Sequence, residues 1–308
     1  MKKLLLLLTV VLFVSCSSNK QERENFLKTQ MIESYKSGEW QLALSYIDTL
    51  RSSGVDLDIL PIEAECYAGI GEYDKAIAML EKEIELDTMS DIHYIYQTLG
   101  NIYHYKKDYD KSIINYKKTI ELNPFYVRPY VNLAEIFELT GDKQQSVDYY
   151  LAAIRLFAEH NFIDETIEYS NKVLTIDPEN IEAYKYLQYG LHSSKQYNDA
   201  VSVGLRLDNI LEEKELFDER CENWLFTGMA AFDCKDYPLS YFCISNAMQS
   251  EGVKETYGYL GYSYLSALSR KQGDLELAKE YSNIAKSYGK DPEDQKKFLY
   301  HLIQMIKI

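Results

Sequence analysis

A small side chain returns along this sequence at nearly regular intervals, each time near the start of an amphipathic segment. The successive intervals between these positions are 33, 36, 34, 20, 34, 40 and 38 residues. Such a period indicates repeated pairs of antiparallel helices, because a small residue lets the two helices of a pair approach closely. The eight positions are Ala43, Ala76, Ser112, Ser146, Thr166, Ala200, Ser240 and Ala278.

The segments around these positions have helical patterns of large and small residues. Tyr96, Leu99 and Tyr103 follow the i, i+3, i+7 spacing that places side chains on one face of a helix. A reciprocal set of small residues lies on the segments that come first in each pair, where it lets the second helix approach. This set comprises Ala64, Gly100, Ala134 and Gly228.

These motifs resemble the tetratricopeptide (TPR) repeat family. The resemblance is carried by the related segments 71–77 and 107–113, and by the closing Leu-Asn-Pro and Ile-Asp-Pro at 122–124 and 176–178. It implies an all-α fold, a superhelical solenoid of about 7–8 helix-turn-helix repeats over residues 24–292. The helical run at 293–308 is then expected to form a C-terminal capping helix.

Three places depart from the repeat pattern. The interval of 20 residues leaves open whether residues 147–160 form the second helix of one repeat or the first helix of the next. Residues 208–220, rich in Glu and Asp, are expected to be an insertion. The first helix of the last repeat, around 257–270, is expected to be about one turn longer than the repeat pattern requires.

The N-terminus has the features of a secretory signal. Lys2 and Lys3 precede an apolar run that is too short to span a bilayer, so residues 1–15 are expected to be a signal peptide. The sequence Phe-Val-Ser-Cys at 13–16 resembles a bacterial lipobox, which implies a lipid on Cys16. The alternative is an ordinary signal peptide followed by an incidental cysteine. Residues 16–25 are polar and are expected to be a lipidated tether.

The N-terminal segment resembles that of lipoproteins from diderm bacteria, and the resemblance is Bacteroidota-like. In that family the residues after the lipidated cysteine indicate where the protein is located. A non-Asp residue at Ser17 implies sorting to the outer membrane. Residues 17–21 lack acidic side chains, which favours the periplasmic face and leaves the cell surface as the alternative. The formal net charge of −15 argues against nucleic-acid partners and against electrostatic binding to anionic lipid.

No catalytic motif is present in the sequence, and the five histidines are scattered. We therefore expect no enzymatic activity, no cofactor and no metal site. Besides Cys16, the chain has Cys66, Cys221, Cys234 and Cys243, for which free thiols are expected. A bridge between Cys221 and Cys243 is the alternative, since these two lie at opposite ends of a predicted helical hairpin.

The resemblance also implies a concave groove lined by the first helix of each repeat, where a protein or peptide partner of the envelope would bind. Asn101 and Asn132 are attractive there because an amide both donates to and accepts from a peptide backbone. Gln97 stands where chaperone-binding relatives have a lysine, so capture of a C-terminal carboxylate is not expected. The expected groove residues are Tyr94, Gln97, Asn101, His104, Arg128, Asn132, Glu135, Lys185 and Tyr189.

Two further sets of side chains admit more than one interpretation. The apolar residues Leu225, Phe226, Met229 and Phe232 form either an exposed docking patch or a surface covered by the capping helix. The chain has 28 tyrosines, most of them at packing positions. Tyr94, Tyr186 and Tyr189 are expected on the inner face. The leading hypothesis is an outer-membrane-anchored adaptor in envelope assembly, secretion or proteolysis; the alternative is a glycan- or ligand-binding lipoprotein that uses exposed tyrosines.

Overall fold

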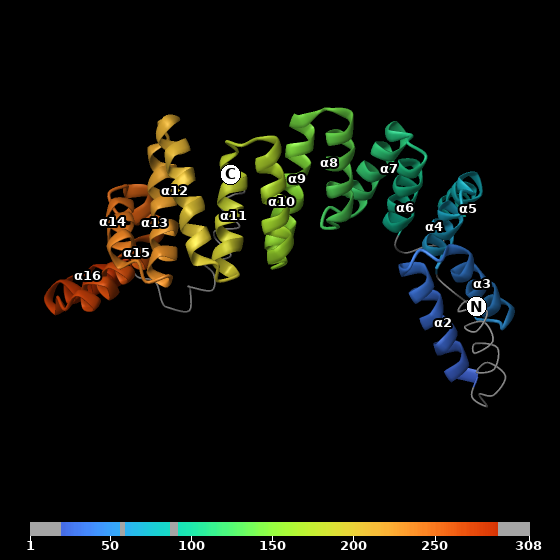
Figure 1. Cartoon of the computed structure of the whole chain (residues 1–308), viewed down its shortest axis with the longest axis horizontal. Helices are drawn as coiled ribbons and strands as arrows, with labels where there is room; N and C mark the ends of the chain where they lie inside the picture. Colours follow the sequence, from blue (N-terminus) through green and yellow to red (C-terminus); the bar gives the residue numbers. More distant parts are fainter. Residues whose placement is uncertain (1–19, 56–58, 87–91, 289–308) are drawn as a thin grey trace. The chain divides into compact units, whose positions relative to one another are not determined.

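The computed structural model describes residues 20–55, 59–86 and 92–288, and all regular structure in these ranges is α-helical (Figure 1). The predicted all-α fold is therefore confirmed for the described part of the chain. The molecule divides into two compact units, Met1–Pro129 and Tyr130–Ile308. The signal segment 1–15, Cys16 and the expected capping helix 293–308 lie outside the described residues.

The described residues of the first unit form three helical hairpins. In each hairpin the first helix, called A, packs against the second, called B, and the A helices α4 and α6 also touch each other. The described helices are α2 (Lys20–Lys36), α3 (Trp40–Ser52), α4 (Leu60–Gly69), α5 (Tyr73–Leu86), α6 (Ile92–Tyr105) and α7 (Tyr109–Leu122).

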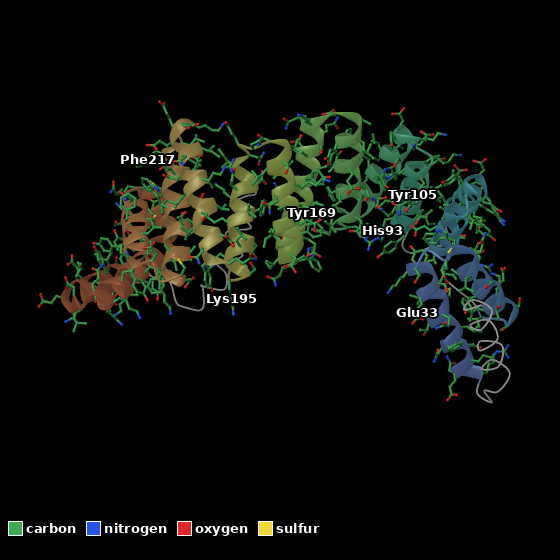
Figure 2. All side chains as sticks on the ribbon, in the orientation of Figure 1. Glu33, His93, Tyr105, Tyr169, Lys195 and Phe217 are labelled. Atoms are coloured by element: carbon green, nitrogen blue, oxygen red, sulfur yellow. The ribbon has the colours of Figure 1, made fainter. Side chains whose placement is uncertain are left out.

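The second unit continues the same arrangement. Figure 2 shows Lys195, in the turn after α11, and Phe217, at the start of α13, at opposite ends of this group of helices, as expected for antiparallel neighbours. Its helices are α8 (Arg128–Thr140, which begins at the boundary between the units), α9 (Lys143–Glu159), α10 (Ile163–Ile176), α11 (Ile181–Ser193), α12 (Tyr197–Glu213), α13 (Phe217–Asp233), α14 (Tyr237–Ala247), α15 (Glu251–Gln272) and α16 (Leu275–Ser287).

The small residues predicted from the sequence lie where helices A and B touch. All eight recurring positions are at most 1% exposed, which confirms the packing role inferred from the repeat. Two of them add a hydrogen bond with the same geometry. The hydroxyl of Ser112 donates to the carbonyl of Gly100 at 2.8 Å, and that of Ser240 donates to the carbonyl of Gly228 at 2.7 Å. Each bond connects the first turn of helix B to the middle of helix A.

The turn that precedes helix B has a local cause in the sequence. A residue with positive φ ends the turn, and the Asp that follows it caps helix B by accepting a hydrogen bond from a backbone N–H three residues later. Gly141 (φ 85°) is followed by Asp142, which accepts from the N–H of Gln145 at 3.1 Å. The same pairing occurs at Lys107–Asp108, Lys235–Asp236 and Gly273–Asp274.

The short 20-residue interval is explained by one additional helix, α10. Helix α9 packs against α8, where the Tyr150 hydroxyl donates to Glu138 at 3.0 Å, and it also packs against α10 and α11. It therefore serves both as helix B of the hairpin with α8 and as helix A of the hairpin with α10. Lys172 of α10 forms an ion pair with Glu138 of α8 at 3.2 Å, so these two helices share one layer, and α9 and α11 share the other.

The other two departures from the repeat are helical extensions. Residues 208–220 form no separate insertion, because they lengthen α12 and α13 to 17 residues each. Arg220 holds the two ends together through ion pairs to Asp208 at 2.6 Å and Glu212 at 2.9 Å. Helix α15 has 22 residues, which agrees with the expected extra length. Helix α2 begins at Lys20, so the last residues of the expected tether 16–25 are helical.

Replacing Gly228 by Ala tests the close approach of helices A and B. A Cβ at this position would lie 2.5 Å from Ile244 Cγ1 and 3.2 Å from the Ile244 backbone nitrogen. We expect Gly228→Ala to lower the free energy of unfolding by about 1–3 kcal/mol through overpacking. The matched control is Gly252→Ala in α15, where the nearest atom lies at 3.8 Å. Urea denaturation that shows equal effects for both variants would contradict this account.

Candidate functional site

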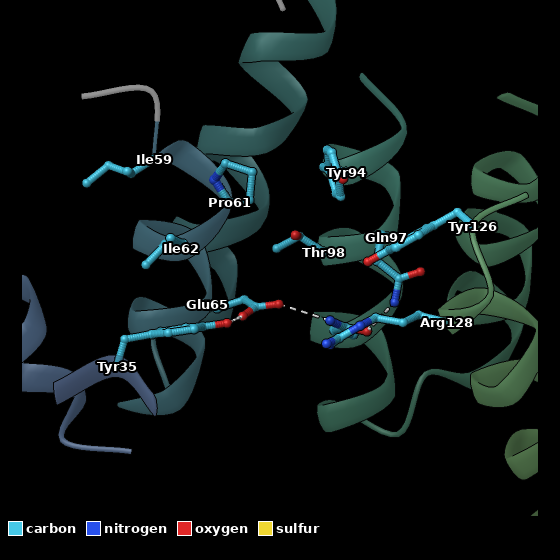
Figure 3. Close-up of a pocket in the computed structure, with 11 residues that line it drawn as sticks. Tyr35, Ile59, Pro61, Ile62, Glu65, Tyr94, Gln97, Thr98, Tyr126 and Arg128 are labelled. Atoms are coloured by element: carbon cyan, nitrogen blue, oxygen red, sulfur yellow. Dashed lines mark hydrogen bonds between the residues drawn. The ribbon is translucent and has the colours of Figure 1, made fainter. Parts of the chain in front are cut away.

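A pocket of about 360 Å³ opens on the first unit (Figure 3). Helix α2 contributes Tyr35, the start of α4 contributes Glu65 and its apolar neighbours, α6 contributes four side chains, and the segment leading into α8 completes the wall. The lining residues are Tyr35, Ile59, Pro61, Ile62, Glu65, Tyr94, Gln97, Thr98, Asn101, Tyr126 and Arg128.

Helix α6 presents its pocket residues through simple helical spacing. Tyr94, Gln97 and Asn101 are separated by three and four residues, so they share one face. The opposite face, which includes Ile95 and Ile102, is fully buried against the α4–α5 hairpin. Four of the predicted groove residues are thereby brought together in the pocket: Tyr94, Gln97, Asn101 and Arg128.

A chain of hydrogen bonds runs along the floor of the pocket. The Tyr35 hydroxyl donates to one oxygen of Glu65, and the Asn101 amide nitrogen donates to the other at 2.9 Å. The Asn101 amide oxygen accepts from the Gln97 amide at 3.0 Å and from the Tyr116 hydroxyl at 2.8 Å. Asn101 was expected to offer its amide to a partner's backbone. Instead, both ends of this amide are engaged inside the protein, and they hold Glu65 in place.

Two phenols of the pocket have a raised pKa. Burial raises the pKa of the Tyr35 phenol well above its ordinary value, and the neighbouring Glu65 carboxylate adds to the rise. Burial also raises the pKa of Tyr126, where Arg128 acts in the opposite direction and Glu65 adds to the increase. At neutral pH the Tyr35 hydroxyl is therefore a permanent donor to Glu65.

Aromatic rings form one edge of the pocket. Tyr94 is 44% exposed, and its ring centroid lies 5.5 Å from that of Tyr126 at an interplanar angle of 73°. The His93 ring lies 4.1 Å from Tyr94, and its Nε2 is 3.3 Å from the side-chain amide of Asn123. Arg128 is exposed beside these rings. Within the described ranges, neither Arg128 nor Glu65 forms a salt bridge.

The remaining predicted groove residues lie elsewhere. His104 does not line the pocket and stacks with Tyr105 at a ring distance of 6.4 Å. Asn132 and Glu135 belong to α8, whereas Lys185 and Tyr189 belong to α11. Because α10 breaks the alternation of A and B helices, α8 and α11 lie in opposite layers of the second unit. The predicted residues of these two helices therefore do not share one groove.

In the second unit, the A layer consists of α9, α11, α13 and α15. Polar side chains on these four helices bind each other. Lys185 pairs with Glu222 at 3.0 Å, and Glu222 also accepts from Tyr257 at 3.2 Å. His192 contacts Asp233 at 2.9 Å. Further contacts of this kind connect Arg155 with Glu182 and Gln188 with Thr227. This network connects α9, α11, α13 and α15, so it stabilises the stack of helices.

The structure corrects two expectations about exposed apolar and aromatic residues. Tyr189 is 5% exposed and Tyr186 is fully buried, so the inner-face tyrosines of the glycan alternative are core residues in α11. Leu225 and Met229 are also buried, in a cluster with residues of α14 and α15, and Phe226 and Phe232 pack against the same cluster. The described helices therefore cover Leu225 and Met229 and partly cover Phe226 and Phe232, so the four side chains do not form an exposed patch.

The pocket residues that the sequence analysis missed include Tyr35, Glu65 and Tyr126. For Glu65 a signal was available. It precedes Asn101 by 36 residues, the same interval that separates Ala64 from Gly100, so the register predicted for α6 also places Glu65 on the groove face of α4. Tyr126 lies between α7 and α8, where repeat register gives no prediction.

Reactive groups were also considered. In the described part of the chain, no three His, Cys, Asp or Glu side chains gather closely enough to hold a metal ion. The cysteines at 66, 221, 234 and 243 are free thiols, and burial raises the pKa of Cys66 and Cys243 to about 12. None of the described helices combines the length and apolar character needed to cross a membrane.

Comparison with known families identifies repeats in the middle of the chain. Residues 100–141 match a model described as "TPR repeat", and residues 127–160 match one described as "Tetratricopeptide repeat". These matches agree with the hairpins formed by α6–α7 and α8–α9, so residues 100–160 contain TPR repeats by sequence and by local structure. No curated protein matches the chain.

The comparison with solved structures also found similar chains. A chain of the APC/C hetero-tetramer Cut9-Hcn1 has a TM-score of 0.42 at 12% identity, over 91% of this chain and 53% of the other, so this protein spans about half of that chain. A MamA protein has a TM-score of 0.35 at 16% identity, over 68% and 97%. MamA 41-end from Desulfovibrio magneticus RS-1 has a TM-score of 0.34 at 14% identity, over 65% and 97%.

The network around Asn101 leads to a stability prediction. Asn101→Ala would leave the Gln97 amide and the Tyr116 hydroxyl without their shared acceptor, so we expect the free energy of unfolding to fall by about 1–3 kcal/mol. Asn115→Ala is the control, because this half-buried side chain on α7 bonds only to the Lys111 carbonyl among the contacts described. Urea denaturation of both variants measures the difference. Equal stability of the two variants would show that the network contributes little.

Proposed function

We propose that this protein is a lipid-anchored adaptor that binds a protein or peptide partner in the pocket of its first unit. Tetratricopeptide repeats are protein-interaction scaffolds, and the pocket lies on the A helices of such repeats. The observation that carries the proposal is the contrast between the two units. A-layer side chains of the second unit are occupied by one another, whereas Glu65 and Arg128 line an open pocket without a salt bridge in the described residues.

The pocket has the mixed lining that suits a peptide segment. Ile59, Pro61 and Ile62 offer apolar contact on one side, and Tyr94 with Tyr126 offers aromatic contact on another. Polar groups held in fixed positions give orientation, as in most ligand sites. The acidic net charge excludes a phosphate backbone as the natural partner. A second candidate, a glycan or small ligand, rests on Tyr94 and Tyr126 alone, because Tyr186 and Tyr189 are buried.

The location belongs to the same proposal. The lipobox-like sequence ending at Cys16 supports a lipid anchor, and Ser17 supports the outer membrane of a diderm envelope, with the protein facing the periplasm. The polar residues after Cys16 would then connect the lipid to the repeats. An adaptor in this position would recruit its partner for envelope assembly, secretion or proteolysis.

Substituting the lipid site tests the anchor. We expect Cys16→Ala to move the protein from the membrane fraction to the soluble fraction, because each acyl CH₂ contributes roughly 0.8 kcal/mol to membrane binding. The melting temperature of the repeats should not change, since the lipid is not part of their core. Cell fractionation with an alkaline wash gives the result. A variant that stays in the washed membranes would contradict a lipid anchor on Cys16.

Substituting an exposed pocket residue tests the binding site. Full-length protein from gently solubilised envelopes is purified by affinity, and the proteins that accompany it are quantified by mass spectrometry. We expect Tyr94→Ala to reduce the recovered partner about tenfold, as for an aromatic hot spot. Phe242→Ala, which removes another exposed aromatic side chain in the second unit, is the control.

Equal recovery with Tyr94→Ala and with the wild type would place the interaction outside the pocket. If no protein is recovered, and instead a glycan binds the wild type and not Tyr94→Ala, the ligand-binding alternative replaces the adaptor.

A further inference from the structure

The carboxylate of Glu65 is held in the pocket by neutral donors and forms no salt bridge within the described residues. The Tyr35 hydroxyl donates to one oxygen and the Asn101 amide to the other at 2.9 Å. Both donors are neutral, so they fix the carboxylate and do not cancel its charge. Within the described residues, no Lys, Arg or His nitrogen lies within 4.0 Å of it. The oxygens still have lone pairs that can accept from a ligand.

Three other carboxylates on helices of this chain have a cationic neighbour. Glu63, two residues earlier on α4, binds Arg51 through both oxygens at 3.1 and 2.6 Å. Glu222 and Glu182, which lie on A helices of the second unit, pair with Lys185 at 3.0 Å and Arg155 at 3.2 Å. A cation from the same chain completes each of these pairs. Beside Glu65, the pocket has room for a cation from another molecule instead.

The walls of the pocket suit the side chain of a basic residue. Tyr94 and Tyr126 meet edge to face beside the pocket, and the faces of such rings attract cations. Pro61 and Ile62 supply an apolar wall for the methylene groups that precede the charged end of Lys or Arg. Figure 3 shows Ile62 and Glu65 on the same side of the pocket, with Tyr35 reaching Glu65 from α2.

We propose that the pocket receives an Arg or Lys side chain of the partner, with its cationic group at Glu65. This inference rests on the proposed function, because it names the chemistry of the partner at the same site. The partner's methylene groups lie against Pro61 and Ile62. The net charge of −15 adds a long-range attraction for a basic partner.

A carboxylate ligand is the opposite possibility, with Arg128 as its counter-ion. In that case Glu65 would be a like charge in the same pocket and would oppose binding. The two possibilities therefore predict opposite signs for the same two substitutions. Glu65→Gln weakens the binding of a cationic ligand and strengthens the binding of a carboxylate ligand. Arg128→Gln has the opposite effect on each.

The test uses the full-length protein in mild detergent and three blocked amino acids as probes. N-acetyl-arginine amide carries a side-chain cation, N-acetyl-glutamate amide carries a carboxylate, and N-acetyl-norleucine amide carries neither. Binding is measured by saturation-transfer NMR titration. We expect the arginine probe to bind at least about tenfold more tightly than the norleucine probe, as a desolvated ion pair allows.

The variants decide between the possibilities. Glu65→Gln should remove the preference for arginine, and Arg128→Gln should raise the affinity for arginine about twofold to threefold by removing a like charge. Gln at position 65 can still accept from Asn101 and bond to Tyr35, so the fold is expected to persist, and an unchanged melting temperature checks this. Glu121→Gln, at an exposed position of α7, changes the net charge by the same amount. It should have no effect on the binding of any of the probes.

Equal binding of the arginine and norleucine probes, or an arginine preference that survives in Glu65→Gln, would overturn this inference. Preferred binding of the glutamate probe that is lost in Arg128→Gln would replace it with carboxylate recognition. Either result is distinct from failure of the adaptor function, because partner recovery with Tyr94→Ala is measured separately and does not depend on the charge of the anchor.

Discussion

The close approach of the two helices in each hairpin is the contact on which the other features of this fold depend. Gly100 and Ser112, and likewise Gly228 and Ser240, remove side-chain bulk on both sides, and the serine hydroxyl then reaches the opposite carbonyl. With the hairpin fixed in this way, the large residues around it, such as Tyr116, have one position available. That position places the Tyr116 hydroxyl on Asn101, and Asn101 in turn fixes Glu65. Packing inside one hairpin thereby determines the position of a charge in the neighbouring one.

Polar side chains on the A helices have two different roles in the two units. In the second unit they pair across neighbouring helices, as Lys185 does with Glu222, and such partly buried pairs help to fix the relative position of the helices. In the first unit Glu65 is bonded to neutral donors and faces a pocket. An acidic side chain on an A helix can therefore serve stability or binding, and the presence or absence of a paired cation on a neighbouring helix decides which role applies.

The sequence predicted the features that follow from local periodicity. Burial of the small residues and the face of α6 that carries Tyr94, Gln97 and Asn101 both follow from helical spacing. It could not predict that α9 serves two hairpins, because a shift of layer depends on which neighbours a helix finds in space. The burial of Tyr189 is a consequence of that shift. Side-chain pairing between helices, such as that of Asn101 with Glu65, likewise depends on contacts 36 residues apart.

The pocket carboxylate has an energetic consequence for binding. A partly desolvated charge bonded to neutral donors is less stable than one that also has a counter-ion in the same chain, so the free protein retains part of the desolvation cost. A ligand cation that enters the pocket recovers this cost and finds its acceptor already oriented by Tyr35 and Asn101. Orientation before binding reduces the entropy lost on association. A residue that stabilises the free protein poorly is therefore, for the same reason, well suited to bind a cation.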